Sequence, residues 1–167
     1  MFSDLQGRLG VVFGVANKRS IAWSIAQGLH AAGMKLAVTY QNERLEQEAK
    51  DLILSMPGAE AYMCDVSKDE EIARLFATLK ERHGKLHTLV HSVAFAPAEE
   101  LKGDFINTSR EGFRVALDVS VYSLVAVSRA AAFSAAACCD TEEVFSNSFQ
   151  RSSVTWARWR FACERTS

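Results

Sequence analysis

The chain has 167 residues, of which 49% are apolar and 23% charged, and its formal net charge is −1. These values are typical of an ordinary globular protein of one domain, and they give no indication of nucleic acid or an anionic membrane as a partner. No stretch approaches the roughly 18 apolar residues that span a bilayer, and the first residues show no signal-peptide pattern, so we expect a cytosolic protein.

The four cysteines, Cys64, Cys138, Cys139 and Cys163, form no C-x-x-C pair and have no histidine nearby in the sequence. Structural zinc sites depend on closely spaced Cys and His ligands, so we predict no metal site. We expect free thiols in a reducing compartment.

The first strand and helix are predicted from a short apolar run and the periodic pattern after it. Residues 9–15 are apolar and β-branched, which is typical of a buried parallel strand. A helix follows, with Ser20 as its N-cap and Gly33 just beyond its end. Its apolar positions recur at helical spacing at Ile21, Ile25 and Leu29, with Ala22 and Ala26 beside them.

The same alternation of strand and helix continues along the chain. Further strands are predicted at residues 35–40, 61–64 and 87–93, and further helices at residues 43–55, 67–84 and from Ser109 to about residue 132. Strands that alternate with helices of this length indicate a parallel sheet with right-handed crossovers. The fold class predicted is therefore α/β, a doubly wound parallel sheet of the Rossmann-like kind.

The character of the sequence changes after residue 132. Residues 133–167 contain three of the four Cys and two of the three Trp, and they show no period of 2 or 3.6. We therefore predict an incomplete dinucleotide-binding domain over residues 1–132 and an irregular tail over residues 133–167. We interpret the tail as the product of a truncation or a shifted reading frame.

The turn between the first strand and its helix is a candidate anion site. Free N–H groups at a helix N-terminus favour negative charge, Gly14 allows a close backbone approach, and Ser20 offers a hydroxyl and an N–H. Because only one glycine lies between Val12 and Ile21, the G-x-G-x-x-G pattern is absent, and a plain turn with a capping serine is an equal alternative.

The ends of the second and third strands carry polar residues that suit an adenosine. Gln41 is neutral and can hydrogen-bond a ribose, which favours NADH, although a solvated loop residue would look the same. Asp65 and Val66 could bind an adenine amino group and pack on its ring. In isolation we favour the simpler reading in which Asp65 caps the following helix.

Five short runs, taken together and in this order, carry a resemblance to a known family. They are G-V-A-N-K-R-S-I-A at residues 14–22, T-Y-Q at 39–41, C-D-V at 64–66, H-S-V-A-F-A-P at 91–97 and S-V-Y-S at 120–123. Over about residues 7–132 the chain resembles NADH-dependent enoyl-acyl-carrier-protein reductase, a member of the short-chain dehydrogenase/reductase superfamily. The resemblance implies type II fatty-acid synthesis, with reduction of a trans-2-enoyl thioester on acyl carrier protein, and assembly as a homotetramer.

The resemblance also implies roles for individual residues. The turn would hold the cofactor pyrophosphate, the second strand end would reach the ribose, and the third would hold adenine. Val93 would contact NADH near the nicotinamide, and Ala96 would border the acyl substrate. The cofactor residues implied in this way are Gly14, Ser20, Ile21, Gln41, Asp65, Val66 and Val93.

The catalytic residues of the family have no counterpart. The family uses a tyrosine to stabilise the enolate and a lysine a few residues later, both after a fifth strand. Here the tyrosines are Tyr40, Tyr62 and Tyr122, and the last lysine is Lys102. We therefore predict no catalytic residue and expect this chain not to catalyse the reaction.

Two alternatives remain. The first is a non-catalytic module that binds NADH or joins full-length partners. To join partners it would use the apolar face of the long helix, from Phe113 to Val125, although we expect that face to be core packing. A different short-chain reductase is the weaker alternative, because Gln41 and residues 91–97 argue against it. In the doubly wound order 3-2-1-4, which we predict here, the fourth strand should pair with a fifth; if residues 133–167 supply none, an apolar edge is exposed, so we expect low solubility.

Overall fold

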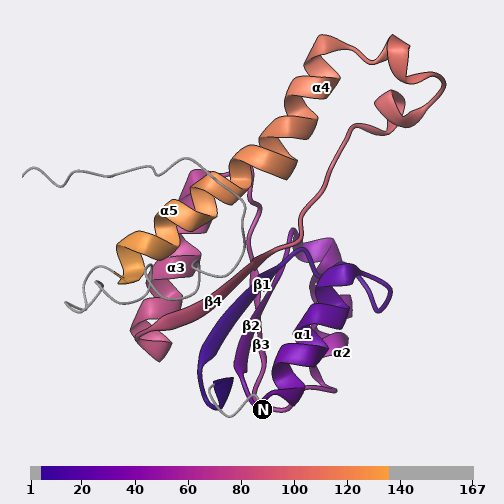
Figure 1. Ribbon diagram of the computed structural model, residues 1–167. Helices are drawn as coiled ribbons and strands as arrows, with labels where there is room; N and C mark the ends of the chain where they lie inside the picture. Colours follow the sequence, from indigo (N-terminus) through magenta and orange to yellow (C-terminus); the bar gives the residue numbers. More distant parts are fainter. Residues whose placement is uncertain (1–4, 136–167) are drawn as a thin grey trace, which may run out of the picture. The chain divides into compact units, whose positions relative to one another are not determined.

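The computed structural model describes residues 5–135 (Figure 1). Four parallel strands form one sheet in the order β3-β2-β1-β4. The strands are β1 (Leu9–Phe13), β2 (Lys35–Tyr40), β3 (Glu60–Met63) and β4 (Leu86–His91). The predicted doubly wound parallel sheet is confirmed, with each strand within about three residues of its predicted ends.

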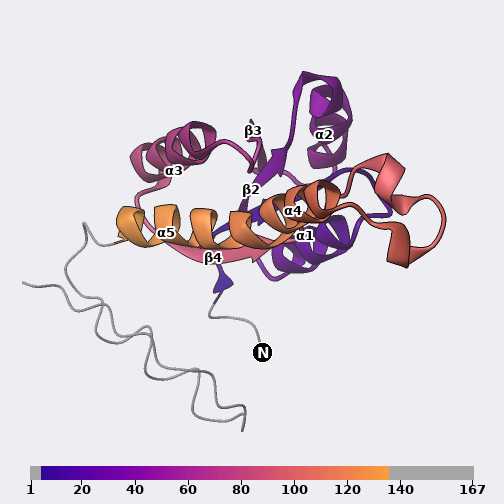
Figure 2. The same ribbon diagram turned by 90° about the horizontal axis from the view of Figure 1, so that it is seen from above.

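Helices cover both faces of the sheet. The helices α1 (Ile21–Ala31) and α2 (Glu46–Ile53) lie on one face, and α3 (Asp69–His83) and α5 (Ser123–Ala135) lie on the other (Figures 1 and 2). Short 3-10 turns occur at Glu43–Leu45, Ala98–Leu101 and Phe105–Asn107.

Alternate side chains of the strands enter two separate cores. Val11 and Phe13 of β1 pack with α3 and α5, whereas Val12 between them packs with α1 and α2. All three side chains are fully buried. This period of two follows from the pleat of a strand that is covered on both faces.

The ends of α1 are as predicted, but its buried face is shifted. Ser20 is the N-cap, and Gly33 follows the helix with a positive φ of 88°. The buried residues are Ala22, Trp23 and Ala26, whereas Ile21 is 74% exposed. Trp23, the largest side chain on the helix, is part of the core on this face of the sheet.

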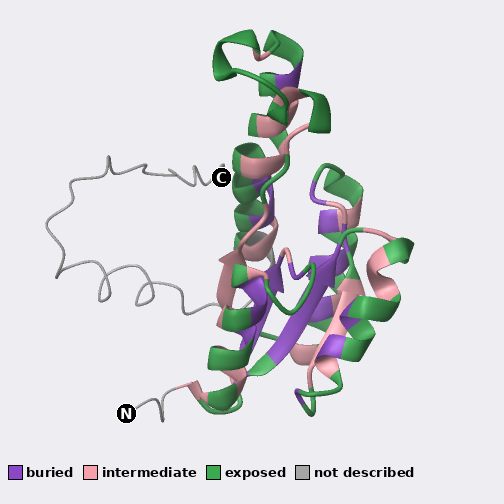
Figure 3. Ribbon diagram, turned by 90° about the vertical axis from the view of Figure 1, so that its right-hand side faces the viewer, coloured by how far each residue is buried: buried purple, intermediate pink, exposed green. Residues whose placement is uncertain are grey.

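A long helix follows the loop after β4, and it contains an irregular turn. Ser109 caps α4 (Arg110–Leu117), a π-helical turn follows over Asp118–Tyr122, and α5 continues from there. The expectation that its apolar face is core packing was wrong. The large apolar residues of that face are 44–55% exposed (Figure 3), and they are Phe113, Leu117, Val121, Tyr122, Leu124 and Val125.

This helix is also the one part of the described chain with the length and composition of a membrane span. Its segment Arg110–Ala132 reaches a mean hydropathy of 1.4, contrary to the expectation that no such stretch exists. One such helix is weak evidence for a membrane span. The absence of a membrane partner stays a prediction.

The strand β4 lies at the edge of the sheet. Within residues 5–135 it pairs only with β1, as the predicted order implies. The register shifts near its start, where Leu9 pairs with Leu86 but Gly10 pairs with Thr88. The extra residue is His87, whose Nδ1 accepts a hydrogen bond of 3.3 Å from the Leu9 N–H.

Candidate functional site

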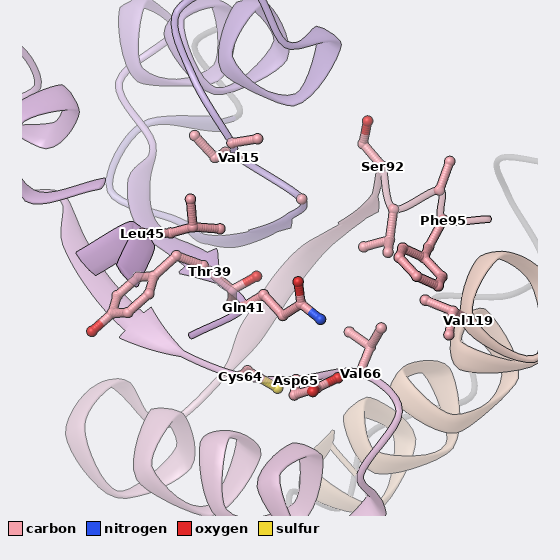
Figure 4. A pocket seen from close by; sticks show the side chains of 15 residues that line it. Val15, Thr39, Gln41, Leu45, Cys64, Asp65, Val66, Ser92, Phe95 and Val119 are labelled. Carbon is pink, nitrogen blue, oxygen red and sulfur yellow. The ribbon is translucent and has the colours of Figure 1, made fainter. Parts of the chain in front are cut away.

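A pocket lies where all four strands end at the carboxyl edge of the sheet (Figure 4). This edge includes the point at which the strand order reverses, between β1 and β4, which is where doubly wound folds bind ligands. The pocket is lined by Gly14, Val15, Ala16, Thr39, Tyr40, Gln41, Leu45, Cys64, Asp65, Val66, Ser92, Val93, Ala94, Phe95 and Val119.

Gly14 brings the chain after β1 unusually close to the end of β4. Its φ is +90°, and a Cβ built on it would lie 2.0 Å from the Ser92 carbonyl oxygen. The Ser92 N–H also donates to the Phe13 carbonyl oxygen at 3.2 Å. No side chain fits at this position, so the floor of the pocket is bare backbone.

The turn before α1 is held by its own hydrogen bonds. The Asn17 side chain accepts from the Arg19 N–H at 2.9 Å, and the Asn17 carbonyl accepts from both the N–H and the hydroxyl of Ser20. The Ser20 hydroxyl in turn accepts from the Trp23 N–H at 3.2 Å. Both donors of Ser20 are thus engaged within the turn in this structure, and its role toward a cofactor stays a prediction.

The free donors at this helix end belong to the next two residues. The first N–H groups of a helix have no partner within it. Of these, Ser20 and Trp23 are satisfied locally, which leaves Ile21 and Ala22 without one in the described part of the chain. Ser20 and Ile21 do not line the pocket, but they follow directly from the turn that does.

Asp65 both shapes a turn and lines the pocket. Its carboxylate accepts from the Ser67 N–H at 3.0 Å and the Ser67 hydroxyl at 2.7 Å. Burial alone would raise the pKa of Asp65, but these bonds, the Lys68 charge and a hydrogen bond from Gln41 together lower it. Asp65 is therefore ionised at neutral pH, and Figure 4 shows Gln41 close beside it.

The apolar lining near Asp65 comes from its two neighbours. Val66 and Cys64 are both buried in the core on the α3 side. Burial, with the charges of Glu71 and Asp65, raises the pKa of the Cys64 thiol to about 12. Cys64 is thus a neutral free thiol, as predicted, whereas the other three cysteines lie outside the described residues.

The far wall of the pocket comes from the segment after β4 and from the π-helical turn. The Ser120 hydroxyl accepts a hydrogen bond from the Phe95 N–H at 3.0 Å and donates one to the Phe95 carbonyl oxygen at 3.2 Å. This contact places Phe95 beside Val119 of the turn (Figure 4). Val93 lines the pocket as predicted, but Ala96 does not.

A second contact ties the same turn to the sheet. The Ser123 hydroxyl lies 2.7 Å from His91 Nε2 and donates to the Val119 carbonyl at 2.6 Å. Burial lowers the pKa of His91. The folded state therefore favours the neutral imidazole of His91.

Five of the eight predicted site residues thus meet in one pocket, and they are Gly14, Gln41, Asp65, Val66 and Val93. Sequence reasoning missed Ser92, Phe95 and Val119, which come together only in the tertiary structure. Among the residues described, no cluster of three or more His, Cys, Asp or Glu lies where it could hold a metal ion.

The arrangement fits a dinucleotide by its chemistry. A side-chain-free turn and two free N–H groups suit a pyrophosphate, and a neutral amide beside an ionised carboxylate suits a ribose and an adenine amino group. Apolar residues on both sides of this polar strip suit flat rings.

Comparison with known proteins indicates the family of the chain. A family model described as "Enoyl-(Acyl carrier protein) reductase" matches residues 14–153, which extends past residue 132 into the predicted tail. The NADH-dependent enoyl-acyl-carrier-protein reductase FabI of Bacillus cereus is 49% identical over 129 residues, which are 76% of this chain and 50% of that protein. The corresponding protein of Aquifex aeolicus is 46% identical over 125 residues, which are 75% of this chain and 46% of that one.

Solved structures of similar proteins from the same two organisms superpose well. The Aquifex aeolicus enzyme gives a TM-score of 0.75 at 44% identity, covering 78% of this chain and 57% of that one. The Bacillus cereus enzyme, solved with NADP⁺ and an indole naphthyridinone, gives 0.75 at 47% identity, covering 78% and 52%. The chain spans about half the length of the curated relatives it matches. With a family match over most of its length and this pocket at the switch point of its sheet, the chain belongs to the enoyl-acyl-carrier-protein reductase family.

Proposed function

We propose that residues 5–135 bind NADH and supply the cofactor half of a reductase that acts on trans-2-enoyl thioesters of acyl carrier protein. The observation that carries this proposal is the convergence of Gly14, Gln41, Asp65, Val66 and Val93 on one pocket at the strand ends. The names of the relatives, which are NADH-dependent reductases of that substrate, support the same cofactor and substrate.

Each part of the pocket has a role in this proposal. Gly14 and the N–H groups of Ile21 and Ala22 would receive the pyrophosphate, with Ser20 fixing the helix end. Gln41 would bind the ribose. The adenine would lie between Asp65 and Val66 and the nicotinamide near Val93, with Ala96 towards the substrate. When bound, NADH supplies the hydride that reduces the enoyl double bond.

We further propose that this chain binds NADH without turnover. The reaction needs a donor aimed at the developing enolate and a fixed cation near the cofactor. The resemblance assigns these roles to a Tyr and a Lys, and residues 133–167 contain neither. An assay of NADH oxidation by the purified chain with a trans-2-enoyl thioester tests this, and turnover at a rate usual for enzymes would contradict it.

Binding itself is tested by titrating the full chain with NADH and following cofactor fluorescence. Gln41→Ala removes the predicted ribose contact at an exposed position, so the fold should persist. One hydrogen bond contributes about 0.5–1.5 kcal/mol, so the dissociation constant should rise roughly 2- to 12-fold. The matched control is Gln27→Ala, at an exposed position of α1 outside the pocket. No NADH binding by the unmodified chain, or equal loss in both variants, would refute the proposal.

The exposed face of the long helix supports assembly with further subunits. Phe113, Leu117 and Val121 are 45–55% exposed on one side of it, although single exposed apolar residues are ordinary. We propose that this face is the contact of a homotetramer or, in the alternative function, of a complex with full-length reductase subunits. Within the described residues nothing covers it.

Sedimentation of the full chain distinguishes the assemblies. Val121→Asp should dissociate the complex because it places a charge in the middle of the apolar face. Ser128→Asp, at an exposed position of the same helix, is the control. A monomer, both alone and with a full-length reductase of the family, would refute the contact.

A cytosolic location and the absence of nucleic-acid partners remain proposals that rest on the free Cys64 and the near-neutral net charge.

A further inference from the structure

A second pocket adjoins the first at the ends of β2 and β3. It shares Gln41 and Asp65 with the first pocket, so it lies beside the position proposed for the adenosine ribose. Its remaining lining is unlike that of the first, because most of it is charged. The residues are Gln41, Asn42, Glu43, Arg44, Met63, Asp65, Lys68 and Glu71.

Glu71, in the first turns of α3, organises this second pocket. One carboxylate oxygen of Glu71 accepts from the Lys68 ammonium at 2.8 Å, and the other accepts from the Asp65 N–H at 2.8 Å. The Glu71 side chain is only 17% exposed, and Lys68 also lies 3.9 Å from the Asp65 carboxylate. Lys68 is therefore held between two carboxylates.

The balance of charge in this pocket is negative. Three acidic side chains, Glu43, Asp65 and Glu71, face two basic ones, Arg44 and Lys68. This balance suits a hydroxyl group, whereas a phosphate offers only acceptors and brings further negative charge.

We propose that Glu71 determines the choice between NADH and NADPH. By pairing with Lys68 it keeps that cation from a 2′-phosphate, and it adds a negative charge of its own beside the ribose. The pocket therefore accepts a free 2′-hydroxyl and disfavours a 2′-phosphate. Glu71 is a positioning residue in this account, and the inference rests on the proposed binding of NADH.

The test compares the dissociation constants of NADH and NADPH for the full chain and for Glu71→Gln. Glutamine keeps an oxygen that can accept from the Asp65 N–H, but it releases Lys68. NADPH should bind roughly tenfold more tightly relative to NADH, the effect of one new charge-assisted hydrogen bond. The gain should shrink at high salt, which a merely structural change would not produce.

The matched control is Glu70→Gln, which removes the same charge from the adjacent residue of the same helix. Glu70 is exposed and does not line the pocket, so the ratio of the two constants should change less than twofold. Adding Lys68→Gln to Glu71→Gln should abolish the gain. An unchanged ratio in Glu71→Gln, or an equal gain in Glu70→Gln, would overturn the proposal.

If Glu71→Gln does not fold, as judged by its thermal melt, Lys68→Gln answers the same question. It leaves Glu71 unpaired, so discrimination against NADPH should increase, and an unaltered ratio would overturn the proposal. The proposed function and the role of Glu71 are contradicted by different results. If NADH does not bind the unmodified chain, the proposed function fails, whereas NADH binding with no effect of Glu71 refutes only this inference.

Discussion

Gly14 and Ser92 lie so close that a Cβ on Gly14 would be 2.0 Å from the Ser92 carbonyl oxygen. The two residues follow β1 and β4, the strands between which the order of the sheet reverses. Their contact brings two backbone segments together and forms the floor of the pocket. Both strand ends must move if any side chain is introduced at residue 14.

Gly14→Ala should therefore destabilise the fold and open the floor of the site. The positive φ of 90° and the backbone clash together should cost on the order of 2–4 kcal/mol in free energy of unfolding. Urea denaturation followed by circular dichroism measures this change. The control is Gly28→Ala in α1, where a Cβ meets nothing within 4 Å, and which should stabilise by about 0.5–1 kcal/mol. Equal stability of the two variants would contradict the clash.

Ser20→Ala removes the side-chain cap of α1. The N–H of Trp23 then loses its hydroxyl partner, and the variant should lose about 1 kcal/mol of stability. Ser24→Ala, at an exposed position of the same helix, should change stability by less than about 0.5 kcal/mol. Denaturation midpoints of the two variants measure the change in stability, and a similar loss of stability in both would show that the side-chain cap is not the cause.

Two histidines should make the fold sensitive to acid. Burial lowers the pKa of His91 below its ordinary value of 6.5, and burial with the charges of Arg8 and Lys85 lowers that of His87. The unfolded chain therefore takes up these protons at a higher pH than the folded chain. Their contribution to stability is complete above about pH 6.5 and is lost as the pH falls through the lower folded values.

Thermal melts between pH 7 and pH 5.5 measure this loss. The melting temperature should fall as the pH is lowered, and His87→Asn with His91→Gln should flatten the profile, because the amides keep an acceptor near the Leu9 N–H and a donor near the Ser123 hydroxyl oxygen. An unchanged slope in the double variant would assign the acid sensitivity to other groups.

Cys64 should be chemically inert in the folded chain. Its pKa of about 12 and its burial at 3% exposure leave almost no accessible thiolate at pH 8. Mass spectrometry of the peptide that contains Cys64, after treatment with iodoacetamide, should show little modification without denaturant and complete modification in guanidinium. Rapid labelling of the folded chain would mean that the local structure opens readily.

Much of the fold could be read from local patterns. The strand Lys35–Tyr40 and the cap at Ser20 agree with the structure because β-branched runs and capping residues act on their own neighbours. The sheet order is the one usual for a doubly wound fold of the Rossmann-like kind. The predicted residues at the strand ends, such as Gln41 and Asp65, meet because the carboxyl ends of parallel strands share one edge.

Other features depend on partners that are distant in the sequence. Helical spacing placed Phe113 and Val121 on one face, but no local pattern says whether another element covers that face, and the expectation of core packing was wrong. Ser120 reaches Phe95 through a π-helical turn that periodicity does not reveal.

The sequence alone therefore determined the class of fold and the residues at the strand ends, since backbone sterics and side-chain periodicity act over a few residues. The tertiary structure decided which groups meet. It set the contact of Gly14 with Ser92, the contact of Ser120 with Phe95, and the exposure of the long helix. These contacts depend on how whole elements pack against one another, which no local pattern of residues specifies.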